Sequence, residues 1–189
     1  MIFGPAIGVF EFSSISRGYF LLDQLVKKAP VKILEASAVT PGKFFILING
    51  DEASVDESRK DILSQGAQWL VDEVMIPNLH EEVLPALYSQ NKFQIDESVG
   101  IIETATVSSG IISADFALKS SNVHLIDLRM ARGIGGKAYY FVTGTLDNVQ
   151  SAVEAAVGAL TEKATLVRSD IIARPHEDFL KYFNIGGTP

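Results

Sequence analysis

The chain of 189 residues contains no cysteine. This absence excludes disulfide bonds, thiolate catalysis, zinc sites built on thiolates and iron–sulfur clusters that the chain's own cysteines would hold. No apolar run approaches the roughly 18 residues that a membrane-spanning helix needs. The first residues carry neither the basic segment nor the cleavage pattern of a signal peptide, so we expect an intracellular, cytoplasmic protein.

Basic residues are also in short supply. Lysine and arginine number 16 against 23 aspartates and glutamates, which gives a formal net charge of −7. Such a chain is a poor partner for nucleic-acid phosphates and lacks the basic face that an anionic membrane surface attracts. Hydrophobic residues make up 47% of the chain, which excludes intrinsic disorder and is ample for a packed core.

The sequence contains one unit twice. Residues 7–11 match residues 99–103, and this offset of 92 positions holds as far as Val31 and Val123. The offset becomes 94 at Gly42, and 96 near the ends of the copies, where His80-Glu81 matches His176-Glu177. Because the offset changes only between expected secondary elements, the pattern predicts two domains, residues 1–90 and 91–189, joined at the polar stretch 89–92.

Each copy is expected to fold as strand, helix, two strands, helix and strand. In the first copy the strands are expected at residues 6–12, 31–36, 43–49 and 70–76, and the helices at 15–29 and 52–65, with a short helix after Pro77. This order predicts an α/β (α+β) fold of two tandem ferredoxin-like domains, in which helices cover one face of an antiparallel sheet.

The first helix of each copy has apolar residues at helical spacing, which predicts one buried side. Ser13 or Ser14 is expected to cap the helix of the first copy. The expected buried positions are Ile15, Gly18, Tyr19, Leu22, Leu25, Val26 and Ala29, and in the second copy Val107, Gly110, Ile111, Ala114, Ala117 and Leu118.

Several duplicated motifs carry a likeness to a known family. They are Gly8-Val9-Phe10-Glu11, the pairs Asp23/Lys27 and Asp115/Lys119, the stretch 119–123, the loop Thr40-Pro41-Gly42-Lys43, and Arg174-Pro175-His176. In this order and spacing, the chain resembles the tandem-domain, trimer-forming class of bacterial microcompartment shell proteins from about residue 6 to 184. Within that class it is most similar to the T-type shell proteins of propanediol-utilisation compartments, through residues 133–137 and 76–80.

The resemblance implies a structural protein of the microcompartment shell that is not an enzyme. Three chains would form a homotrimeric, pseudohexameric tile with a central pore for small polar metabolites, and tiles would join other shell proteins edge to edge around encapsulated enzymes. An alternative from the residues is a ferredoxin-like trimeric ligand-binding or sensor protein. An electron-transfer module is nearly excluded because the chain has no cysteine.

The resemblance also assigns residues to the pore and to the tile edge. The pore-lining residues would be Ser37, Ala38, Val39, Thr40, Pro41, Gly42, Arg132, Gly133, Ile134, Gly135 and Gly136. The tile-edge residues would be Lys27, Lys119, Asn78, Arg174, His80 and His176. Simpler interpretations are ion pairs of the two lysines with the aspartates four positions earlier, and an Arg132 that points away from the pore and pairs with a carboxylate of a neighbouring subunit, such as Glu35 or Asp127.

No cofactor, metal or catalytic group is expected. Residues 133–138 have the form G-x-G-x-x-A, but a strand is expected after them rather than the helix of a dinucleotide site. In the T-type relatives a cysteine at the position of Thr40 holds an iron–sulfur cluster in the pore, and threonine is no ligand for such a cluster. The histidines are expected to be structural, and no carboxylate pair stands out as catalytic.

Overall fold

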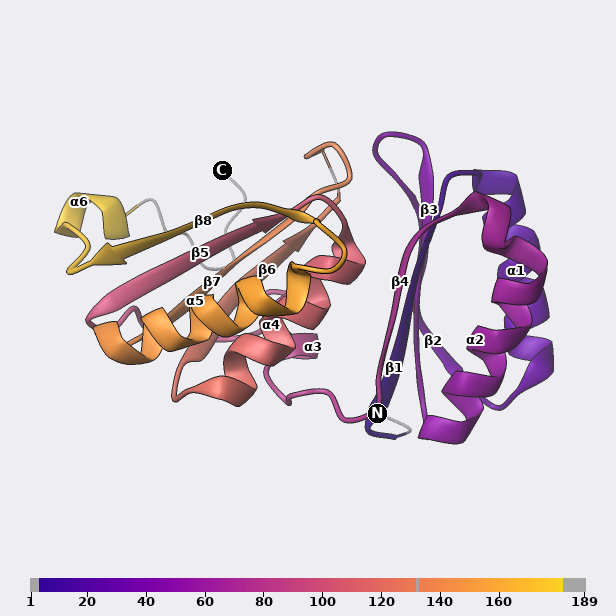
Figure 1. Cartoon of the computed structure of the whole chain (residues 1–189), viewed down its shortest axis with the longest axis horizontal. Helices are drawn as coiled ribbons and strands as arrows, with labels where there is room; N and C mark the ends of the chain where they lie inside the picture. Colours follow the sequence, from indigo (N-terminus) through magenta and orange to yellow (C-terminus); the bar gives the residue numbers. More distant parts are fainter. Residues whose placement is uncertain (1–3, 132, 182–189) are drawn as a thin grey trace. The chain divides into compact units, whose positions relative to one another are not determined.

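The computed structural model describes residues 4–131 and 133–181, and these fold as two similar units (Figure 1). The first unit runs to Leu79 and includes Ala131–Gly136, and the second begins at His80. The domain boundary expected at residue 90 divides the two sequence repeats, whereas residues 80–90 group with the second unit through their contacts.

The first unit has the expected order of elements. They are β1 (Ala6–Phe12), α1 (Ile15–Lys28), β2 (Lys32–Val39), β3 (Lys43–Gly50), α2 (Glu52–Gly66), a 3-10 turn (Ala67–Trp69) and β4 (Leu70–Ile76). The strands form an antiparallel sheet in the order β2-β3-β1-β4, and both helices lie on one face of it (Figure 1). The ferredoxin-like fold is thereby confirmed.

The second unit repeats this plan after a short leading helix. Its elements are α3 (Val83–Leu87), β5 (Ser98–Thr104), α4 (Val107–Ser120), β6 (His124–Met130), β7 (Ala138–Gly144), α5 (Leu146–Leu160), β8 (Leu166–Ala173) and α6 (Glu177–Leu180). The sheet order is β6-β7-β5-β8, and even the register shifts recur: the one between Ile33 and Glu35 returns between Leu125 and Asp127. Each residue of one sheet therefore has a defined counterpart in the other.

Side-chain caps fix where the helices begin. The hydroxyl of Ser14, rather than Ser13, accepts the backbone N–H of Arg17 at the start of α1. Thr106 caps α4 in the same way through the N–H of Ser109. At the start of α2, hydrogen bonds from Ser54 to the Asp51 carboxylate lower the pKa of Asp51. Such caps satisfy backbone N–H groups that have no partner inside the helix.

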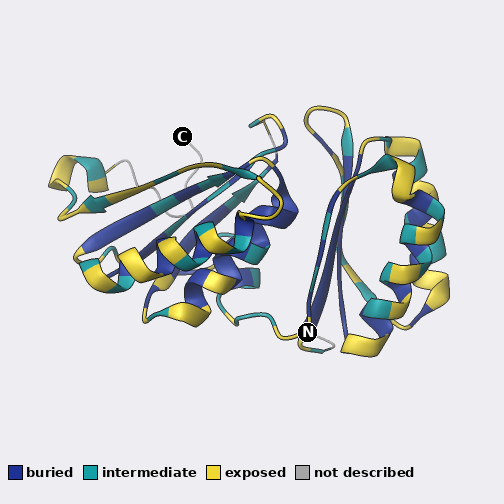
Figure 2. Ribbon diagram, viewed as in Figure 1, coloured by how far each residue is buried: buried dark blue, intermediate teal, exposed yellow. Residues whose placement is uncertain are grey.

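The core of the first unit lies between its sheet and its two helices. It contains Phe10, Phe12, Leu21, Leu25, Phe44, Ile46, Ile48, Val55 and Ile62. The expected buried side of α1 is partly wrong, because Leu21 is buried while Ile15, Tyr19 and Val26 are exposed. Figure 2 shows that both helices of this unit carry buried and exposed residues along their length. The apolar residues of α1 form one wide side, and only the part with Gly18, Leu21 and Leu25 is fully buried against the sheet. In α4 all six expected positions are buried, as predicted.

Both first helices approach their sheet closely at a glycine. A Cβ atom built on Gly18 would lie 2.4 Å from the side chain of Phe44, and one on Gly110 would lie 2.6 Å from the Cβ of Ala138. Carbon atoms do not pack at such distances, so the helix can sit this near to the sheet only because these residues lack a side chain.

The Gly18→Ala substitution is therefore expected to destabilise the protein. The added methyl group overfills a packed contact, which typically costs about 1–3 kcal/mol. Gly158→Ala is the matched control: Gly158 lies in α5 with nothing within 4 Å of its would-be Cβ, and a helical glycine replaced by alanine gains roughly 0.5–1 kcal/mol. Thermal unfolding at one protein concentration should show opposite shifts. Equal shifts would contradict the close contact.

Candidate functional site

Each sheet has a second face, turned away from its two helices. On β1 and β3 the side chains alternate, so Val9, Phe45 and Leu47 point opposite to the core residues Phe10, Phe44 and Ile46. We call this the helix-free face. In the first unit Val9, Phe45 and Leu47 are all buried.

The same positions in the second unit are more open. The counterparts of Val9, Phe45 and Leu47 are Ile101, Tyr139 and Phe141, which are paired on β5 and β7 and each half-buried. The rings of Tyr139 and Phe141 meet edge to face at 5.6 Å between centroids. The helix-free face of the second unit is thus an aromatic surface that the single chain covers only in part.

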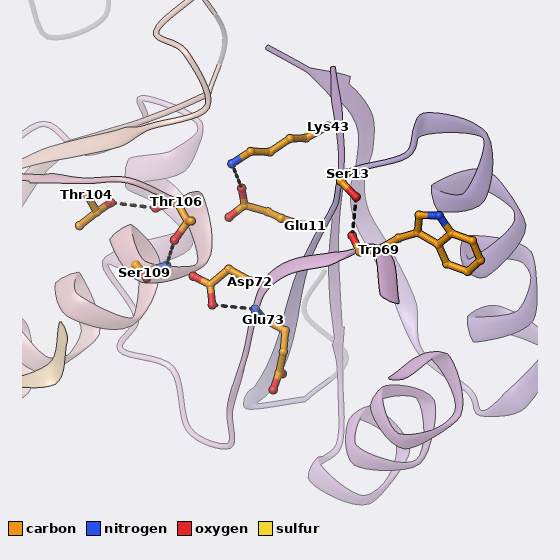
Figure 3. A network of polar contacts seen from close by, with 9 residues as sticks. All are labelled: Glu11, Ser13, Lys43, Trp69, Asp72, Glu73, Thr104, Thr106 and Ser109. Atoms are coloured by element: carbon orange, nitrogen blue, oxygen red, sulfur yellow. Dashed lines mark hydrogen bonds and ion pairs between the residues drawn. The ribbon is translucent and has the colours of Figure 1, made fainter. Parts of the chain in front are cut away.

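Both helix-free faces contain an ion pair at equivalent positions. Figure 3 shows Lys43 on β3 reaching Glu11 on β1, with 3.2 Å between the lysine nitrogen and the carboxylate, and the Glu11 side chain has no exposed surface. The counterpart is Lys137 with Glu103, at 2.7 Å, and here the Glu103 side chain is 35% exposed. The duplicated pair shows that the two faces are built alike and differ in how far they are covered.

Charged pairs surround the aromatic surface of the second unit. On β6, Arg129 pairs with Asp127, and on β8, Arg168 pairs with Asp170 at 3.0 Å. The hydrogen bond from Arg168 lowers the pKa of Asp170. An apolar centre within a polar rim is the usual composition of a protein–protein interface.

Two loops join the equivalent strand pairs β2–β3 and β6–β7. In the first, Thr40, Pro41 and Gly42 are exposed and the N–H of Gly42 donates to the carbonyl of Val39. Ser37, Ala38 and Val39, expected to line a pore, belong to β2, which runs further than its expected end at residue 36.

The second loop depends on glycine. Gly133, Gly135 and Gly136 have φ of 75°, 68° and 79°, in the left-handed region that other residues adopt at a cost. Ile134 lies among them, and Arg132 is outside the described residues. Strand β7 follows this loop, as expected, where the dinucleotide-binding motif would have a helix. Whether the two loops line a pore stays a prediction.

Each copy contains one Asp–Lys ion pair on its first helix. Lys27 lies 2.5 Å from Asp23 on α1, and Lys119 lies 2.6 Å from Asp115 on α4. Arg174 and Asn78, the other residues expected at a tile edge, are exposed. The ion-pair interpretation is confirmed geometrically, and it leaves the edge role of the lysines open as a prediction.

The two histidines that end the copies adopt one local structure. The Nδ1 atom of His80 accepts the N–H of Glu82 at 3.3 Å, and that of His176 accepts the N–H of Asp178 at 3.1 Å. Across residues 4–131 and 133–181, no group of three His, Cys, Asp or Glu side chains is placed to hold a metal ion. Among the same residues, no helix is long and apolar enough to cross a membrane.

Comparison with known proteins decides the family. The BMC domain model matches residues 6–79 and 98–175, one match to each repeat. The chain is also 40% identical to the bacterial microcompartment shell protein PduT of Citrobacter freundii, over 91% of this chain and 94% of that protein. The chain belongs to the bacterial microcompartment shell proteins. Its role is therefore structural, in the shell, and the interpretation as a sensor has no support.

Other shell proteins show the same relation. The chain is 30% identical to the shell protein EutM of Escherichia coli K12 over 48% of this chain and 91% of EutM, so EutM has the length of one repeat. A crystal structure of a microcompartment protein from Desulfitobacterium hafniense matches with a TM-score of 0.82 and 38% identity, covering 94% of this shell protein and 98% of that chain. The fused permuted hexameric shell protein MSM0275 from the RMM microcompartment shares the fold, with a TM-score of 0.63, 18% identity and coverage of 82% and 81%.

Sequence reasoning did not find the buried Glu11–Lys43 pair or the unequal cover of the two helix-free faces. The repeat alignment contained a signal for the pair, because Glu11 and Lys43 align with Glu103 and Lys137. Burial on a helix-free face cannot be read from such an alignment, since the two copies carry similar residue types.

Replacing Lys43 should destabilise the shell protein strongly. Lys43→Met removes the cation from a fully buried carboxylate, and breaking a buried ion pair typically costs about 3–5 kcal/mol. Lys27→Met is the matched control, because its pair with Asp23 is exposed and worth about 0–1 kcal/mol. Chemical denaturation should separate the two variants clearly, and adding Glu11→Gln to Lys43→Met should recover part of the loss. A Lys43→Met variant as stable as Lys27→Met would contradict this account.

Proposed function

We propose that three copies of this shell protein close into a ring that serves as a pseudohexameric tile with a central pore for small polar metabolites. The proposal rests on one observation above all. The helix-free face is buried in the first unit, whereas Ile101, Tyr139 and Phe141 of the second unit remain half-exposed in the single chain.

Equivalent surfaces of a duplicated domain favour equivalent contacts. A second copy placed on the aromatic surface would bury Ile101, Tyr139 and Phe141, and with them the Glu103–Lys137 pair, whose counterpart Glu11–Lys43 is buried. Such a contact joins different surfaces of two copies, and head-to-tail contacts form closed rings when the rotation closes. Three chains with two BMC domains each supply the six domains of the tile that the family resemblance implies.

The pore is the second part of the proposal. The exposed turn of Thr40, Pro41 and Gly42 and the glycine loop 133–136 join equivalent strands of the two units, so a ring of six domains would bring one loop from each domain to its centre. Threonine hydroxyls and backbone amides there suit small polar solutes. Arg132, with three copies in a trimer, would add positive charge.

We propose no catalytic role and no resident iron–sulfur cluster. The candidate pore residue is Thr40, and its hydroxyl is no ligand for a cluster that cysteines hold. The structural role of the family agrees with a shell component that catalyses no reaction and selects which solutes pass its pore.

Introducing a charge on the aromatic surface should break the trimer. Phe141→Asp places a carboxylate in the apolar centre of the proposed interface, where an unpaired charge is costly. Phe116→Asp is the control, because Phe116 is exposed on α4, on the helix side of the same sheet. Size-exclusion chromatography should show single chains for Phe141→Asp and the wild-type size for Phe116→Asp, with circular dichroism confirming that both fold. A Phe141→Asp variant that keeps its oligomer would refute the proposed interface.

The edge assignment predicts that Lys119 acts between tiles. In Lys119→Ala, Asp115 keeps the hydrogen bond from the N–H of His80, so the fold and the trimer should persist while extended sheets are lost. Lys60→Ala on α2 is the control, because Lys60 forms a similar pair with Asp56. Electron microscopy of concentrated protein should show sheets only for the control and the wild type. Loss of the trimer in Lys119→Ala would overturn the edge role.

A further inference from the structure

The segment that follows the first sheet docks on α4 and β6 of the second unit. The backbone N–H of His80 donates to the carboxylate of Asp115 at 2.8 Å. The carboxylate of Glu82 accepts the N–H of Leu125 at 2.8 Å and binds Nδ1 of His124 at 2.9 Å. Two residues of β6 and one of α4 thereby hold one short segment in place.

The same segment provides hydrogen-bond partners for the backbone of β6, the outer strand of the sheet. Strand β6 is an edge strand, whose outward backbone groups need partners. At Leu125 the N–H is bonded by Glu82, and the carbonyl accepts the side-chain amide of Asn91 at 2.6 Å. Val83 and Ala86 of α3 are fully buried in this arrangement. The docked segment is therefore a structural part of the second unit, polar at its ends and apolar in the middle.

The segment that follows the second sheet has the same design. His176, Asp178 and Phe179 stand 96 positions after His80, Glu82 and Val83, an offset that also relates β4 to β8. The two histidines form the same turn, each accepting the N–H two residues later. In the single chain, however, His176 and Asp178 are exposed and Phe179 is half-buried, whereas Val83 is fully buried.

The matching acceptor surface lies open on the first unit. Asp23, Lys32 and Ile33 occupy the positions of Asp115, His124 and Leu125. The Asp23 side chain is 52% exposed against 3% for Asp115. Ile33 is 37% exposed while Leu125 is fully buried, and Ile33 also lies on an edge strand, β2.

The apolar residues in the middle of this acceptor surface are also more exposed in the first unit than in the second. Tyr19 on α1 is 58% exposed, whereas its counterpart Ile111 on α4 is fully buried. Val26, which corresponds to Leu118, is likewise exposed. These are the residues of α1 for which the sequence predicted burial. Their apolar character is explained if a segment covers them.

We infer that residues 174–181 of one chain dock on α1 and β2 of a second copy of this chain. The N–H of His176 bonds Asp23 of that copy, Asp178 faces Lys32 and the N–H of Ile33, and Phe179 lies against the apolar residues of α1. The charges are complementary, since an aspartate and a lysine take the places of Glu82 and His124. The inference rests on the proposed trimer and names the contact that links successive copies.

Chemical cross-linking tests this contact on the full-length protein, which has no cysteine of its own. The variant Lys32→Cys/Asp178→Cys, treated with a short bismaleimide, should give covalent dimers and trimers on denaturing gels. Co-expression of differently tagged chains, one with Lys32→Cys and one with Asp178→Cys, should give a heterodimer. Glu82→Cys/His124→Cys, which must link within one chain, calibrates the reach of the reagent. Lys60→Cys/Asp178→Cys is the negative control, with Lys60 exposed on α2.

An exchange of the two charges tests the same contact if the cysteine variants do not assemble. Lys32→Glu and Asp178→Lys alone should each raise the protein concentration at which the trimer dissociates by about tenfold, and the double variant should restore the wild-type value.

The outcomes separate the inference from the proposed function. Links between chains at the Lys32/Asp178 pair, with none at the Lys60 control, support the contact. A trimer without these links, or links confined within one chain, overturns the inference and leaves the proposed tile standing. A wild-type protein that is a monomer overturns both.

Discussion

A four-stranded sheet has two faces, and two helices cover one of them. The rest of this shell protein depends on how the second face is buried. In the first unit Val9, Phe45 and Leu47 on this face are buried, and beside them the fully buried carboxylate of Glu11 pairs with Lys43, which stabilises the fold only in a well-fitted surrounding. In the second unit the same face carries Tyr139 and Phe141, with Glu103 and Lys137 beside them, and is only half covered. An apolar surface of this kind calls for a partner.

Because the domain is duplicated, the difference in burial between equivalent residues can be interpreted. Two copies with the same strand order and the same register shifts should bury the same positions, so each difference in burial marks a place that one chain leaves open. Two such places emerge, the aromatic surface of the second unit and the α1–β2 surface of the first. The aromatic surface is half-exposed where its counterparts are buried, and the α1–β2 surface lacks a docked segment like the one that follows His80. The proposed head-to-tail ring would cover both surfaces at a single type of interface.

Most of the fold could be predicted from the sequence. Turn residues mark the ends of the strands, and the repeat offset requires each element to recur in the second copy. Strand β4 begins and ends at the expected residues, and the ferredoxin-like order of elements is confirmed in both units. The buried side of α1 was predicted only in part, because hydrophobic periodicity does not say which part of a wide apolar side packs on the sheet. Burial of Glu11 escaped prediction because a carboxylate in a strand normally indicates a solvent-facing position. The likeness of the motifs to shell proteins, by contrast, pointed to the family that the comparisons confirm.

The central claim is that the wild-type chain is incomplete alone and closes in threes. Native mass spectrometry of the wild-type protein at low micromolar concentration tests it most directly. The account predicts one dominant species with three times the 20.5 kDa mass of the chain, and no open series of larger species under conditions that prevent tiling. A stable monomer or dimer as the dominant species would contradict it.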